Sequence, residues 1–198
     1  MAPVLSHDLS EEMVAKLGQD CAPQPAIAAF AARLAGRSDA AAVEVAGQEV
    51  FGAYGARLMR RTLELGEQYT DQTYEILKAA AKKTGYLHFP HVAQRFLEIA
   101  YLATQPVSTV DIVENNHYRL VNRMGPYCVL YKGVKESCGD AVAAEMPCRH
   151  ACLGAMQSLY DALRLDVAVT QEALMSKDEQ CRFVATNNRP LEPTPWRR

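Results

Sequence analysis

Apolar residues recur at intervals of three and four through the first half of the chain, which is the spacing of one face of an α-helix. The pattern predicts helices over residues 6–17, 26–35, 39–65, 70–83 and 88–102. Gly47, Gly52 and Gly55 interrupt the longest of these helices, and each costs about 1 kcal/mol relative to alanine in a helix interior. We therefore expect either a break near Gly47 or another backbone or a ligand packed closely against this helix.

After Pro106 the pattern changes from helical spacing to partial alternation. Runs of apolar residues separated by turn formers predict strands over 107–114, 117–124, 165–175 and 180–185. Helical spacing returns in one segment, residues 147–163, between the two pairs of strands. This order predicts an α+β fold, in which a helical N-terminal half is followed by a small antiparallel sheet with a packed helix.

Composition narrows the class of protein. The chain has 198 residues, 49% of them hydrophobic, which suits one domain over 37–186 with a helical extension over 1–36 and a flexible tail over 187–198. The 21 basic and 23 acidic residues give a net charge of −2 without a long basic run, which argues against nucleic-acid binding. No apolar stretch approaches the ~20 residues of a membrane span, and residues 1–7 lack secretory-signal features. We expect a cytoplasmic protein that binds neither nucleic acid nor membrane.

Cysteine usage gives the first chemical signal. Five of the six cysteines lie close together in the second half of the chain: Cys128, Cys138, Cys148, Cys152 and Cys181. Because a reducing cytosol disfavours disulfides, such a group indicates metal or thiol chemistry. The alternative is that these cysteines are buried as small hydrophobic residues.

A metal site can be drawn from these cysteines in two ways. Cys148 and Cys152 are four residues apart, so on a helix they share one face, and Cys181 lies in the closing hairpin. Tetrahedral zinc would need one further ligand besides these. An iron–sulfur cluster would instead take four thiolates, from Cys128, Cys138, Cys148 and Cys152.

Cys148 is also a candidate nucleophile. It lies two residues before His150 and beside Arg149, near a predicted helix start, where positive charge favours the thiolate. Such a thiolate could attack an electrophilic carbon of a small molecule. Successive helical residues point about 100° apart, however, so Cys148 and His150 face each other only if the helix starts later.

A resemblance to a known family rests on the C-terminal quarter of the chain. The residues that carry it are Pro147-Cys148-Arg149-His150-Ala151-Cys152, then Val169 to Met175, then Asp178-Glu179-Gln180-Cys181-Arg182-Phe183. This segment resembles the C-terminal half of the 4-vinyl reductase domain superfamily, which includes sensor domains and L-2-amino-thiazoline-4-carboxylate hydrolase-like proteins. Those chains end in a hairpin that reads roughly Gly-Asp-x-x-Cys-x-Phe, with Lys177 here in place of the glycine.

The resemblance implies a fold related to Bet3-type trafficking proteins, a homodimer and a mostly apolar cavity for a small molecule. In the sensor members, zinc is held by a cysteine near the helix start, by Glu-x-x-Cys and by the hairpin cysteine. The matching residues here are Cys148 or Cys152, Glu172 and Cys181, whereas Met175 stands where the family has its other cysteine. Because a thioether is a poorer zinc ligand than a thiolate, the resemblance implies a substitute. The candidates for it are the second helix cysteine, His150, Cys128 and Cys138.

Two functions are consistent with these observations. The first is binding of a small hydrophobic or heterocyclic molecule beside the cysteines, with hydrolysis of that molecule by Cys148 and His150. The second is a non-catalytic binding or carrier protein with a structural zinc or iron–sulfur site. Its metal ligands would come from Cys148, Cys152, Cys181, Glu172, Cys128 and Cys138. Tyrosines that cluster in mid-chain, Tyr127 and Tyr131 among them, could orient a ligand, although most would be core residues.

Overall fold

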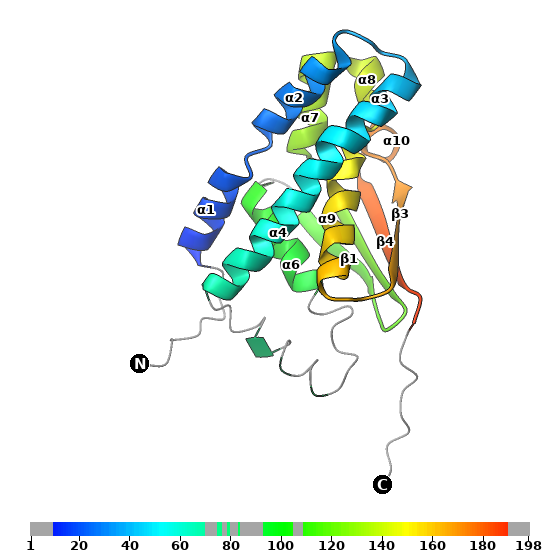
Figure 1. Cartoon of the computed structure of the whole chain (residues 1–198). Coiled ribbons are helices and arrows are strands. Elements are labelled where there is room, and N and C mark those ends of the chain that lie inside the picture. The colour runs from blue at the N-terminus through cyan, green and yellow to red at the C-terminus, as the bar shows by residue number, and fades with distance from the viewer. Residues whose placement is uncertain are drawn as a thin grey trace.

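Helices make up the first half of the described chain, and a small sheet lies in the second half (Figure 1). The computed structural model describes residues 10–69, 93–104 and 109–189, with the single positions 75, 76, 79 and 83. The helices of the first half are α1 (Glu11–Asp20), α2 (Gln24–Leu34), α3 (Ala40–Gly47), α4 (Ala53–Gln68) and α6 (Ala93–Thr104). Apart from those single positions, the helix predicted over 70–83 lies outside the described residues.

The helix starts follow ordinary capping chemistry. The Ser10 hydroxyl accepts a hydrogen bond from the Met13 N–H at 3.4 Å, and the Asp39 carboxylate accepts one from the Ala42 N–H at 2.9 Å. Between α3 and α4 the chain continues as a π-helical segment, η1 (Gln48–Gly52). The helix predicted over 39–65 is therefore unbroken at Gly47 but changes its winding there.

The second half contains the sheet and the helix that packs on it. The elements are β1 (Thr109–Asn115), β2 (Arg119–Gly125), α7 (Val129–Cys138), α8 (Asp140–Ala144), α9 (Arg149–Ala162), β3 (Val167–Ala173), α10 (Met175–Asp178) and β4 (Cys181–Asn187). The strands are antiparallel and lie in the order β1-β2-β4-β3, so the last strand pairs with both β2 and β3. This confirms the predicted α+β fold with a helical N-terminal half.

Two short helices differ from the sequence-based expectation. The run from Tyr127 to Tyr131, which the pattern left unassigned, contains the start of α7, whose buried side chains are Leu130 and Val134 alone. The stretch predicted as a turn between the last two strands contains α10. α10 has four residues, too few for a periodic signal. α7 is as long as α1, but its N-cap is Cys128 and not one of the Ser, Thr, Asp or Asn residues that mark a helix start.

One hydrophobic core joins the helices to the sheet. The side chains of Leu120 and Met124 on β2 and of Phe183 on β4 lie on the same face of the sheet. Alternate residues of a strand share a face, and the pairing of β2 with β4 brings these faces together. Met156 and Leu159 of α9 lie in the same cluster. The described part of the predicted N-terminal extension shares this core through the following side chains of α1 and α2: Met13, Leu17, Ile27 and Phe30.

The glycines of the long helix explain how closely α9 approaches it. A Cβ atom added at Gly55 would overlap the carbonyl group of Ala151, and one added at Gly154 would lie 2.7 Å from the Gly52 carbonyl oxygen. Of the two explanations that the sequence offered, close packing of another backbone therefore applies here, with α9 as the partner.

Candidate functional site

A small cavity lined largely by sulfur lies between α9 and the sheet. Its lining residues are Met124, Cys128, Met146, Cys148, Arg149, Cys152, Met175, Cys181 and Phe183, and we call it the sulfur pocket. The cavity volume is about 20 Å³. A single water needs roughly 10–15 Å³ on the same scale, so the sulfur pocket has no room for an organic molecule.

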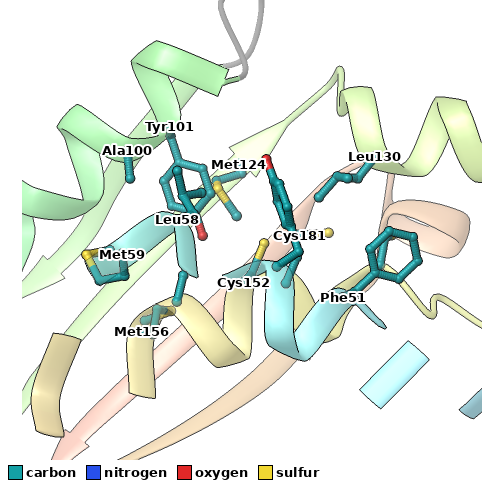
Figure 2. Packing of buried hydrophobic residues seen from close by; sticks show 14 of the residues in the cluster. Phe51, Leu58, Met59, Ala100, Tyr101, Met124, Leu130, Cys152, Met156 and Cys181 are labelled. Atoms are coloured by element: carbon teal, nitrogen blue, oxygen red, sulfur yellow. The ribbon is translucent and has the colours of Figure 1, made fainter. Parts of the chain in front are cut away.

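Local structure explains why these cysteines meet. Cys148 and Cys152 lie one turn apart at the start of α9, as their spacing predicted. Cys181 begins β4 and is paired in register with Met124 of β2. Cys128 is the N-cap residue of α7. Figure 2 shows the side chains of Cys152 and Cys181 in the buried cluster, coming from the helix and from the sheet.

Three thiols of this pocket, those of Cys148, Cys152 and Cys181, have raised pKa values. Burial raises the pKa of Cys148 and Cys152 far above the usual range of a thiol, and the neighbouring cysteines raise both further. Burial also raises the pKa of Cys181, to about 11. Because a thiolate is the nucleophilic form, these three groups are poor nucleophiles at neutral pH.

A tyrosine lies behind the pocket. Tyr101 of α6 is 3% exposed. Burial raises the Tyr101 pKa well above its usual value, and the Cys152 thiol beside its hydroxyl raises it further. Figure 2 shows Tyr101 and Cys152 in the same buried cluster.

The donor set does not fit a metal ion as it is arranged. Within residues 10–69, 93–104 and 109–189, no group of three or more His, Cys, Asp or Glu side chains is placed to hold one. Cys138 lies at the far end of α7 and is not part of the sulfur pocket. Glu172 lies on β3, where its Oε1 is 3.5 Å from Arg119 Nη2, and it is also outside the sulfur pocket. Zinc and an iron–sulfur cluster stay predictions that this geometry does not support.

The structure does not bring Cys148 and His150 together. The helix begins at Arg149, so these two side chains diverge by the rotation of two helical residues. His150 Nε2 lies 3.1 Å from Glu44 Oε1 of α3, on the side of α9 that faces η1. Arg149 holds the other oxygen of the same carboxylate at 2.6 Å. His150 and Arg149 thus tie α9 to α3, and among the described residues that line the sulfur pocket beside Cys148 there is no His, Asp or Glu.

The contact between Glu44 and His150 should make the free energy of unfolding depend on pH. Burial disfavours the Glu44 carboxylate, but His150 and Arg149 outweigh it and hold the Glu44 pKa below its ordinary value of 4.5. A carboxyl group whose pKa is lowered by folding stabilises the fold above its unfolded pKa and loses this effect as the pH falls through the folded pKa. In Glu44→Gln, the free energy of unfolding measured in urea should therefore fall less steeply as the pH drops below 4.5. At neutral pH the substitution should lower this free energy by less than about 1 kcal/mol. Equal pH dependence in both proteins would contradict this expectation.

An open groove adjoins the sulfur pocket. Its volume is about 450 Å³, and it is lined by Pro126, Tyr127, Cys128, Tyr131, Lys132, Lys135, Met175 and Glu179. We call it the outer groove. Cys128 and Met175 line both cavities, so they form the wall between them. No pattern in the sequence indicated this role for Cys128, because α7 itself was not predicted.

The charges of the outer groove are unevenly compensated. Lys135 Nζ lies 3.0 Å from an Asp140 carboxylate oxygen, which raises the Lys135 pKa. Lys132 Nζ is 3.7 Å from Glu136 and 5.5 Å from the centre of the Tyr127 ring. The two lysines are equally exposed, but the ion pair of Lys132 is longer than that of Lys135, so Lys132 is the cation more readily available to a ligand.

Comparisons of the chain with protein-family models, curated proteins and solved structures find no match. The resemblance to the 4-vinyl reductase superfamily therefore stays a prediction, together with the Bet3-like topology, the dimer and the zinc site that it implies. None of the described helices is long and apolar enough to cross a membrane.

Proposed function

We propose that the protein binds a small organic molecule with an aromatic or heterocyclic ring in the outer groove, against the cysteines of the sulfur pocket. One observation carries the proposal: a groove of about 450 Å³ shares the side chains of Cys128 and Met175 with a cavity lined by further thiols. The volume lies within the ~300–1,000 Å³ range of small-molecule sites. The organic ligand belongs in the groove because the sulfur pocket itself is too small for it.

The chemistry of the groove favours an aromatic ligand with an acid group. Tyr127 and Tyr131 offer ring faces and edges for offset or perpendicular contact with another ring. Lys132 offers a cation on the same helix as Tyr131. Glu179 is the acidic side chain of the groove and comes from the chain next to α10, so an acid group on the ligand is best placed toward α7.

Binding is better supported than hydrolysis by Cys148. Hydrolysis by Cys148 needs a thiolate with a base beside it. The Cys148 thiol is instead buried with a raised pKa, and His150 contacts Glu44. A carrier or ligand-binding protein needs only the groove. The dimer stays a prediction, for which light scattering of the purified chain gives the mass.

Anilinonaphthalene sulfonate, which has aromatic rings and one anionic group, is a suitable probe for the groove. We expect its fluorescence to rise on titration, with one binding site per chain. Lys132→Ala and Tyr131→Ala should each weaken the Kd about five- to ten-fold, which corresponds to roughly 1–1.4 kcal/mol. Lys16→Ala is the matched control, because Lys16 is an exposed lysine on α1 with its own ion pair to Asp20.

The outcome separates a groove from unspecific adsorption. Equal Kd values in the Lys132, Tyr131 and Lys16 variants would mean that the probe binds elsewhere, and no saturable binding would remove the proposal. Circular dichroism melts of each variant check that the fluorescence does not come from partly unfolded protein, which also binds this dye.

A further inference from the structure

We infer that Cys128 is the reactive thiol of the outer groove and that it forms a covalent bond with α,β-unsaturated carbonyl compounds that bind there through an aromatic ring and an acid group. This inference rests on the proposed function, since the groove has to bind such a molecule first. The sequence predicted Cys148 as the nucleophile, whereas here the reactive thiol is Cys128, the N-cap residue of α7.

Accessibility distinguishes Cys128 from the other thiols of the sulfur pocket. Cys148, Cys152 and Cys181 are exposed by only 4%, 7% and 6% and face the closed cavity. Cys128 is half-buried and lines the open groove as well. A molecule in the outer groove therefore meets the Cys128 sulfur first.

Positive groups lie close to the Cys128 sulfur. As N-cap of α7, its Sγ accepts a hydrogen bond from the Tyr131 N–H at 3.4 Å, so the positive end of a ten-residue helix is directed at the sulfur. Lys132 lies one turn further along the same helix and lines the same groove. A partly exposed cysteine in positive surroundings is the usual setting of a reactive thiol.

The size of the groove indicates that this end of α7 can receive a ligand. Its volume of about 450 Å³ is large enough for a ring system, and Cys128 lies in its wall beside Tyr127, Tyr131 and Lys132.

The covalent step is a conjugate addition. The Cys128 thiolate attacks the β-carbon, an S–C bond forms, and the C=C π bond breaks as its electron pair moves to the carbonyl oxygen as an enolate. The enolate then takes up one proton at the α-carbon, which replaces the proton that the thiol released. No leaving group, oxidant or reductant takes part.

The chain contains a matched control thiol. Cys138 ends the same helix, is also half-buried, and lies at the negative end of the helix dipole. Burial raises the pKa of Cys138, and Cys138 is not among the residues that line the outer groove. Because both cysteines are half-buried, comparing their reaction rates tests the effect of position on the helix and in the groove.

The experiment treats the full chain with para-maleimidobenzoate, which has a ring, a carboxylate and a conjugated carbonyl, and follows each cysteine by peptide mass spectrometry. We expect Cys128 to react at least about ten-fold faster than Cys138, as thiolate-stabilising surroundings imply. Lys132→Ala removes a positive charge near the Cys128 sulfur and should slow both probes. N-phenylmaleimide lacks the carboxylate, so the variant should slow the benzoate probe several-fold more than the phenyl probe. Equal or slower reaction at Cys128 than at Cys138 would overturn the inference.

Dye binding by the native chain separates this inference from the proposed function. Serine is a good N-cap, so Cys128→Ser keeps α7 and should lose the fast maleimide reaction. Loss of dye binding in the native chain would remove the proposed function. Retained dye binding with no preference for Cys128 would remove only the reactive thiol.

Discussion

Replacing Gly55 by alanine is expected to destabilise the fold by about 3 kcal/mol, the upper part of the range for overpacked interiors. The added methyl group would enter the carbonyl of Ala151 on α9, which is backbone and has no alternative rotamer to adopt. Either α4 and α9 separate, or one of them bends. Because this contact joins the long helix to the helix that carries Cys148 and Cys152, the sulfur pocket should also loosen.

Gly52→Ala is the matched control for this experiment. Gly52 lies three residues earlier in the same helical run, and an added Cβ there meets nothing within 4 Å. Alanine has the higher helix propensity, so this variant should be neutral or more stable by up to about 1 kcal/mol. Urea unfolding followed by circular dichroism gives both values, and equal midpoints for the two variants would show that α4 and α9 do not meet at Gly55.

Phe183→Ala should cost about 3–5 kcal/mol, as truncation of a buried phenylalanine generally does. The Phe183 side chain is fully buried on the inner face of β4 and closes one side of the sulfur pocket. Its removal deletes apolar contacts and enlarges the cavity, since the surrounding backbone of a paired central strand relaxes little. Thermal and urea unfolding report the loss.

The neighbouring residue on the same strand is the control for the Phe183 variant. Val184 is 3% exposed but points to the opposite face of the sheet, outside the main core cluster. Val184→Ala removes a smaller side chain and leaves the sulfur pocket untouched, so it should cost clearly less than Phe183→Ala. Equal losses would mean that burial alone, and not the packing around the pocket, sets the cost.

The sequence predicted those parts of the site that depend on regular spacing. The i, i+4 pair Cys148 and Cys152 on α9, and Cys181 at the start of the last strand, follow from helical and strand periodicity. These three meet because β4 lies beside β2 in the sheet, with Cys181 opposite Met124, an arrangement that no local pattern encodes.

Other predicted site residues lie elsewhere for geometrical reasons. Glu172 lies at an irregularity in the pairing of β3 with β4, between Gln171 and Ala173, and contacts Arg119 instead of the pocket. His150 points away from Cys148 because neighbouring helical positions diverge. Cys128 was named as a metal ligand on composition alone, and its place at the start of a helix became visible only in the structure.

Cys128 and Met175 form the wall between the two cavities. Binding in the outer groove and oxidation of the Cys128 sulfur should therefore change each other's free energy. A molecule seated in the outer groove covers the Cys128 sulfur, so it should disfavour reversible oxidation of Cys128. Reciprocity of linked equilibria requires the converse: oxidation of Cys128 must weaken binding in the groove by the same free energy with which the bound molecule disfavours that oxidation. The oxidation state of one side chain would then set how much of the protein is available to its ligand.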